Sequence, residues 1–177
     1  MTAPRIVRRD EVVKTPYVTL VGKHLAGVGG DPFYALELAD YVSIVATTPA
    51  GEFVLVRQFR PAVEAVTLEL PAGLLDAGVT AEETAIRELR EETGFIVDRV
   101  IPVGCLKPDT GRLANRMWIF VAPDAVRDAA SRPEAGLEVS LLTRAELSRA
   151  IADGTFDHAL HVAALLLAAR LGHISLD

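Results

Sequence analysis

The stretch GLLDAGVTAEETAIRELREETGF, residues 73–95, decides how this sequence is interpreted. Thr80, followed three residues later by Glu83, matches the capping box that begins many helices. Good helix formers follow, and Gly94 suits the position just beyond a helix end. The segment therefore predicts a helix, within a stretch that holds six acidic residues.

The helical period sorts the side chains of this segment into two faces. At about 100° per residue, the predicted buried stripe holds Ala85, Ile86, Leu89 and Thr93. Glu88, Glu91 and Glu92 fall together on another face, where like charges repel unless something compensates them. A hard cation such as Mg²⁺ takes carboxylate oxygens as ligands. The pattern predicts a metal site at Glu88 and Glu92, and the alternative is a solvated acidic face.

Short strands and two further helices surround this helix. Alternating or apolar runs predict strands at residues 17–24, 33–38, 41–47, 53–59 and 66–70 before it, and at 100–105, 117–122 and 137–143 after it. Helices are expected at residues 144–153 and 157–171, each close to a glycine. Mixed strands with three helices indicate the α+β fold class.

Composition excludes several classes of function. The 177 residues carry a net charge of −6 and no run of Lys or Arg, so we expect no nucleic-acid partner. A single cysteine cannot form an internal disulfide, which favours the cytoplasm. The apolar run at residues 162–169 is too short to span a membrane, and the four histidines show no zinc-site spacing.

The same segment resembles the Nudix box, the pattern G-x5-E-x7-R-E-U-x-E-E-x-G-U in which U is a bulky apolar residue. The matching positions are Gly73, Arg87, Glu88, Leu89, Glu91, Glu92, Gly94 and Phe95. Val79 stands where the pattern has its first Glu, and it is the one departure. The preceding stretch, residues 55–78, is similar to the region leading into the box in ADP-ribose pyrophosphatases.

This resemblance implies a fold and an assembly. The fold is the Nudix α/β/α sandwich with a mixed sheet, formed by residues 41–177, with N-terminal β-strands in residues 1–40. In the family, such strands help to form a homodimer, and the first forty residues are expected to do so here.

The implied activity is Mg²⁺-dependent hydrolysis of the pyrophosphate bond of a nucleoside diphosphate sugar, with Mn²⁺ as an alternative metal. The first expectation is cleavage of ADP-ribose to AMP and ribose 5-phosphate. Thr110 stands where ADP-ribose hydrolases tend to carry a proline, which leaves other nucleoside diphosphate sugars open. Val79 leaves open a non-catalytic scaffold that binds a nucleotide.

The resemblance also assigns roles to residues. The expected metal ligands are Glu88, Glu92, Glu91 and the backbone carbonyl of Ala72. The expected catalytic residues are Arg87 and Glu134, of which Glu134 is the candidate general base, with Glu138 as the second choice. The candidate substrate-binding residues are Arg57, Arg60, Glu69, Arg112, Asn115 and Arg116. For each loop or strand residue in these sets, the alternative is an ordinary solvated side chain.

Overall fold

A computed structural model describes residues 3–176, which form two compact units. The first unit combines the N-terminal residues up to Asp40 with the loop Lys107–Arg116. The second unit contains Tyr41–Leu106 and the chain from Met117 onward. None of the helices formed by residues 3–176 is long and apolar enough to cross a membrane.

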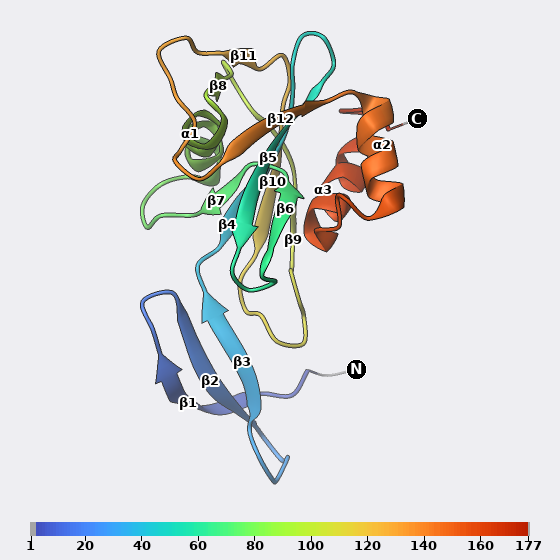
Figure 1. The fold of residues 1–177 in the computed structure, drawn as a ribbon. Helices are drawn as coiled ribbons and strands as arrows, with labels where there is room; N and C mark the ends of the chain where they lie inside the picture. The colour runs from blue at the N-terminus through green and yellow to red at the C-terminus, as the bar shows by residue number, and fades with distance from the viewer. Residues whose placement is uncertain (1–2, 177) are drawn as a thin grey trace. The chain divides into compact units, whose positions relative to one another are not determined.

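The first unit is a three-stranded antiparallel sheet (Figure 1). Its strands are β1 (Ile6–Lys14), β2 (Val18–Leu25) and β3 (Phe33–Leu38), in that order across the sheet. The loop Lys107–Arg116 joins β3 through two backbone hydrogen bonds, in which Leu36 N–H donates to Arg112 O and Ala114 N–H donates to Leu36 O. The sequence patterns did not indicate strand β1, because its residues IVRRDEVVK do not alternate between apolar and polar side chains and none of them is buried.

The second unit is built on a seven-stranded mixed sheet. Strands β12-β5-β4-β10-β9 follow one another across the sheet, β6 pairs with β5, and β7 pairs with β4. The sheet strands are β4 (Tyr41–Thr47), β5 (Phe53–Arg60), β6 (Ala65–Glu69), β7 (Ala72–Leu74), β9 (Ile101–Leu106), β10 (Met117–Ala122) and β12 (Glu138–Leu142). Only β4 and β10 pair in parallel, which makes the sheet mixed.

Helices cover both faces of this sheet (Figure 1). Helix α1 (Ala81–Thr93) packs on one face, and α2 (Arg144–Asp153) and α3 (Ala159–Arg170) pack on the other. A hydrophobic core lies on each face of the sheet. The fully buried Leu89 belongs to the core under α1, and the fully buried Leu165 belongs to the core under α2 and α3. A small pair of strands, β8 (Phe95–Ile96) and β11 (Val126–Arg127), lies outside the main sheet. The expected α+β sandwich with a mixed sheet is confirmed.

Residues at its two ends determine where helix α1 begins and ends. Thr80 caps it, since the Thr80 side chain accepts from Glu83 N–H while the Glu83 carboxylate accepts from Thr80 N–H. Gly94 ends it in the left-handed conformation at φ 70°. Leu89 is buried, as its place in the apolar stripe predicts, and Ile86 is partly buried. The helix and both of its ends were therefore predicted correctly.

Candidate metal and substrate site

A close approach of β7 to α1 forms the inner edge of the site. Gly73 in β7 lies directly against Glu88 of α1, and a Cβ atom on Gly73 would overlap the Cδ and Oε1 atoms of that side chain. The Glu88 side chain is only 13% exposed in this cradle. A glycine at position 73 therefore allows the carboxylate to lie against the strand.

Glu92 is the second enclosed carboxylate of the helix. It is 7% exposed, and its Oε2 accepts a hydrogen bond of 2.9 Å from the backbone N–H of Ala72. Burial raises the pKa of Glu92 to about 7, and the negative charges of Glu88 and Glu134 raise it as well, while the Ala72 hydrogen bond opposes them. Since the charges of Glu88 and Glu134 both act on Glu92, the three carboxylates share one electrostatic neighbourhood.

These two carboxylates fit a divalent cation. Burial also raises the pKa of Glu88, although the guanidinium of Arg87 lies 2.9 Å away and lowers it. Enclosed negative charges whose pKa values are raised lack sufficient positive charge around them. Oxygen ligands from two carboxylates are the set that Mg²⁺ takes in proteins that also present phosphate to it. The cradle at Gly73 leaves the Glu88 carboxylate in place for this role.

Glu91 lies differently from its two neighbours. Its side chain is 52% exposed and pairs with Arg87 at 2.8 Å, one helical turn earlier. The helical period grouped it with Glu88 and Glu92, but the structure separates it from the enclosed pair, because the intrahelical ion pair draws it outward. Its role as a metal ligand stays a prediction.

Arg87 contacts three carboxylates. Its Nη1 lies 2.8 Å from Glu91, and its Nη2 lies 2.9 Å from Glu88 and 3.1 Å from Asp76. Glu83 also precedes Arg87 at the i, i+4 spacing of a helical ion pair, but its carboxylate accepts from the backbone and hydroxyl of Thr80 instead. Because the capping box holds Glu83, Arg87 pairs instead with Asp76 in the loop before the helix.

Arg60 and Glu69 form a second ion pair between β5 and β6. The Nε and Nη2 atoms of Arg60 donate to both Glu69 oxygens, at 2.8 Å and 2.7 Å. Burial raises the pKa of Glu69, but the hydrogen bonds from Arg60 and Thr67 outweigh it and bring the pKa down to about 2. Glu69 therefore carries a full charge that Arg60 neutralises, and it is a partner of Arg60 rather than a free strand carboxylate.

Two histidines lie close to Glu69, and the ligand atoms of Glu69, His158 and His161 are within 4.8 Å of one another. This group is poorly arranged for a metal. The His161 Nδ1 accepts from the backbone N–H of Leu70 at 3.1 Å, and both Glu69 oxygens accept from Arg60. The two imidazole rings stack at 3.8 Å with an interplanar angle of 15°, so their lone pairs lie in nearly parallel planes, which disfavours convergence on one ion.

A cavity of about 690 Å³ opens beside the Arg60–Glu69 pair. Arg57, Arg60 and Glu69 line it from the β5–β6 hairpin, and the α2–α3 connection lines it with His158. Arg57 also donates from Nε to Ser140 Oγ in β12 at 3.3 Å. Since the charge of Arg60 also lowers the pKa of Glu92, this arginine links the cavity to the enclosed carboxylates.

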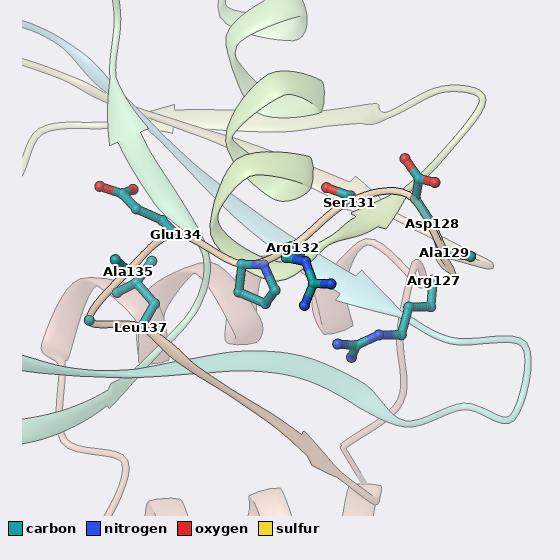
Figure 2. Close-up of a pocket in the computed structure, with 10 residues that line it drawn as sticks. Arg127, Asp128, Ala129, Ser131, Arg132, Glu134, Ala135 and Leu137 are labelled. Atoms are coloured by element: carbon teal, nitrogen blue, oxygen red, sulfur yellow. The ribbon is translucent and has the colours of Figure 1, made fainter.

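The loop between β11 and β12 is tied to the end of α1 by the ion pair of Asp128 with Arg90, at 3.1 Å, and by three hydrogen bonds to backbone carbonyl groups. Asp128 N–H donates to Gly94 O, Ser131 Oγ donates to Arg90 O, and Glu134 N–H donates to Glu91 O at 2.9 Å. Glu91 O and Gly94 O are carbonyl groups that the helix end leaves without intrahelical partners, whereas Arg90 O also accepts from the Gly94 N–H. The loop lines a hollow of about 560 Å³ that includes Arg127 and Arg132 (Figure 2).

Glu134 is an exposed carboxylate on this loop. It extends from the loop in a different direction from the Arg127 and Arg132 guanidinium groups (Figure 2). Its charge raises the pKa of Glu92, so it belongs to the neighbourhood of the enclosed pair. Glu138 is exposed in β12, opposite Arg57 of β5. The role of general base stays a prediction for both residues.

The remaining predicted residues belong to the first unit. Arg112 pairs with Asp109 at 2.7 Å, and the buried Asn115 donates from Nδ2 to Ala39 O. Arg116 donates its backbone N–H to Asp40. These contacts hold the loop Lys107–Arg116 within its unit, and a role in substrate binding stays a prediction for all three residues.

The sequence analysis did not single out Asp76 or His161. Asp76 lies in the box three residues before Val79, and the turn residues between them were a signal that an acid at 76 could approach position 79. His161 is 1% exposed, and burial lowers its pKa to about 3, so it stays neutral and accepts from Leu70. Nothing in the apolar run around it distinguishes His161 from a surface histidine.

Comparison with known proteins agrees with this architecture. A family model described as NUDIX domain matches residues 37–163. A solved structure entitled "Crystal structure of ADP compounds hydrolase" superposes with a TM-score of 0.81 at 24% identity, covering 97% of this chain and 95% of that one. At this identity the superposition establishes the fold alone.

Curated relatives match over shorter segments. An ADP-ribose pyrophosphatase of Bacillus subtilis is 34% identical over 83 residues, which are 47% of this chain and 45% of the relative. Putative nudix hydrolase 2 of Caenorhabditis elegans is 52% identical over 66 residues, 36% of this chain and 30% of the relative. An ADP-ribose pyrophosphatase of Mycobacterium tuberculosis is 31% identical over 129 residues, 71% of this chain and 62% of the relative. The matched segment thus spans less than half of the first two relatives.

Substitution of Gly73 tests the cradle. In Gly73→Ala the new Cβ displaces the flexible Glu88 side chain, so we expect little change in stability. If Glu88 holds a divalent cation, the affinity for Mn²⁺ in calorimetry should fall about tenfold or more, the size of effect seen when the support of a metal ligand is removed. Gly29→Ala is the control, because nothing lies within 4 Å of the added Cβ there. Equal Mn²⁺ affinity in both variants would contradict the cradle.

The raised pKa of Glu92 predicts a pH-dependent stability in chelator-treated protein. The folded-state pKa of about 7 exceeds the usual 4.5, so the folded state binds the proton more tightly. Stability should therefore fall as pH rises from about 4.5 to about 7, by on the order of 3 kcal/mol. Urea unfolding of Glu92→Gln should lack this slope. Parallel pH profiles for the two proteins would show that Glu92 is not the cause.

Proposed function

This chain belongs to the Nudix family, and we propose that it hydrolyses the pyrophosphate bond of a nucleoside diphosphate sugar with Mg²⁺ as cofactor. The proposed substrate is ADP-ribose, cleaved to AMP and ribose 5-phosphate. One observation carries the proposal: two enclosed carboxylates of α1, Glu88 and Glu92, share an electrostatic neighbourhood with the cavity arginine Arg60 and the loop carboxylate Glu134. Relatives named ADP-ribose pyrophosphatase and ADP-sugar pyrophosphatase support the choice of substrate.

Glu88 and Glu92 are the proposed metal ligands, with Glu91 and the carbonyl of Ala72 as additional ones. Bound Mg²⁺ supplies Lewis-acid stabilisation of the phosphoryl oxygens and lowers the pKa of water. The hydrogen bond from Ala72 N–H to Glu92 fixes one ligand side chain against β7. The Gly73 cradle fixes the other, so both ligands are positioned before substrate arrives.

Arg60 and Arg57 are proposed to hold the diphosphate. The Glu69 pair uses Nε and Nη2 of Arg60, so Nη1 has no hydrogen-bond partner among residues 3–176 and is available to a phosphoryl oxygen. Glu69 fixes the plane of the guanidinium, which reduces the entropy lost when the substrate binds. Arg57 lines the same cavity. A planar guanidinium that is held in place suits phosphate recognition better than a mobile lysine.

Glu134 is the proposed general base. Hydrolysis requires a group that takes a proton from the attacking water while the bridging oxygen leaves with its phosphate. The Glu134 backbone is anchored to Glu91 O, one residue before Glu92, so the loop brings its carboxylate to the ligand helix. Glu138 is the second choice, because it lies in β12 opposite the cavity residue Arg57.

Hydrolysis assays with Mg²⁺ test the activity. Wild-type protein should cleave ADP-ribose or another member of a nucleoside diphosphate sugar panel. Glu134→Gln should lower kcat by about 10²- to 10⁴-fold, the usual contribution of a positioned base, and Glu92→Gln should lower it at least as much. Glu138→Gln distinguishes the two candidate bases, because a loss of kcat in this variant and not in Glu134→Gln would assign the role to Glu138. Binding of every panel member without cleavage would favour a non-catalytic nucleotide-binding scaffold.

We further propose that the first unit mediates a homodimer. Its strands expose large apolar side chains, among them Val13 at 54%, Phe33 at 60% and Tyr34 at 52%. An exposed apolar surface on a small sheet gains stability when a partner covers it.

Light scattering tests the dimer. The expected mass is twice the chain mass of 19.0 kDa. Phe33→Glu should raise the dissociation constant about tenfold or more, since a charge placed in an apolar interface is costly to desolvate. Leu166→Glu in α3, which alters a side chain that is 58% exposed, is the control. A monomeric wild-type chain would refute the proposal.

A further inference from the structure

The box carries no acid at its first acidic position, and the local structure shows how an acid can be provided from elsewhere. Val79 occupies that position, and its side chain is 37% exposed without any group that can bind a cation or pair with Arg87. The three other acidic positions of the box are retained as Glu88, Glu91 and Glu92. Position 79 lies in the loop that leads into α1, so this loop lacks the negative charge that the box pattern places there.

A tight turn brings position 76 next to position 79. Val79 N–H donates to Asp76 O at 3.2 Å, which closes a turn of four residues. Gly78, the third residue of this turn, has φ 84°, a conformation that a type II turn requires there and that glycine adopts without strain. The first and fourth residues of such a turn have Cα atoms within about 7 Å of each other. An acid at position 76 thus starts close enough to position 79 to serve the same neighbourhood.

The Asp76 side chain uses this place to contact Arg87. Its Oδ2 lies 3.1 Å from Arg87 Nη2, the same nitrogen that lies 2.9 Å from Glu88. Glu91 binds Arg87 Nη1 at 2.8 Å. Glu83, the other acid at helical spacing from Arg87, is held by Thr80. Asp76 is therefore the upstream carboxylate of the arginine that adjoins both Glu88 and Glu91.

We infer that Asp76 replaces the acid missing at position 79 and acts as a positioning residue for the metal site. This inference rests on the proposed function, in which Glu88 holds the cation. Asp76 shares the Nη2 charge of Arg87 with Glu88, so less of that positive charge opposes a cation on Glu88. Loss of Asp76 leaves Arg87 to Glu88 and Glu91 alone, and it removes one negative charge from the surroundings of the site. Both effects weaken the binding of a divalent cation.

The contact is partly exposed, which sets the size of the effect. The side chains of Arg87 and Asp76 are 38% and 68% exposed, so solvent screens the pair. Exposed pairs of this kind correspond to changes of about two- to five-fold in an equilibrium constant. Asp76→Asn should therefore weaken Mn²⁺ binding about two- to five-fold while the metal-free protein stays folded.

Mn²⁺ titration followed by electron paramagnetic resonance tests the inference without turnover. The series compares wild type, Asp76→Asn, the double variant Asp76→Asn with Val79→Glu, and Glu82→Gln. Glu82 is an exposed acid in the first turn of α1, and its substitution removes the same charge away from Arg87. We expect weaker binding in Asp76→Asn, recovery in the double variant and wild-type binding in Glu82→Gln.

Two results would overturn the inference: Mn²⁺ binding by Asp76→Asn that equals that of Glu82→Gln, or no recovery when Glu is placed at position 79. Steady-state assays on the same proteins separate this question from the proposed activity. A wild type that binds Mn²⁺ and cleaves nothing refutes the proposed hydrolysis and leaves the Mn²⁺ comparison valid. A reduced affinity for the activating metal with unchanged kcat at saturation supports positioning.

Discussion

The contact between β7 and α1 is the constraint on which the rest of the site depends. Gly73 lies against Glu88, and the Ala72 N–H holds Glu92, so two successive strand residues fix two carboxylates one helical turn apart. Both contacts would be lost if β7 shifted along the helix. The turn, the capping box at Thr80 and the packing of Leu89 all serve to keep that register.

Charge balance explains why the two sides of the site differ. Glu69 and Arg60 neutralise each other through two hydrogen bonds, so the Glu69 carboxylate needs no cation. Glu88 and Glu92 are enclosed with less compensation, and their pKa values are raised. The uncompensated pair is where a cation gains most, because burial strengthens its attraction to both carboxylates. The neutral imidazole of His161 adds no charge to either side.

The sequence predicted most of the fold and the centre of the site, because both rest on local patterns. The capping box, the apolar stripe and the box glycines act within a few residues, so α1 and the Glu88–Glu92 spacing could be inferred. What it could not predict depends on distant contacts. Strand β7 forms because β4 lies beside it, and the contact between Asp76 and Arg87 joins residues 11 apart in the chain, which the fold of the loop before α1 brings together. The choice of Arg60 as the partner of Glu69 likewise requires the β5–β6 pairing.

The attachment of the β11–β12 loop has a consequence for how this protein family can vary. Three donors from the loop meet carbonyl groups at the end of α1, so the polarity of the helix terminus decides where Glu134 is placed. Residues between those donors contribute little to the attachment of the loop to the helix. Insertions or deletions between the anchoring residues can therefore alter the outer surface of the loop while the Glu134 backbone stays attached to the same turn of the helix.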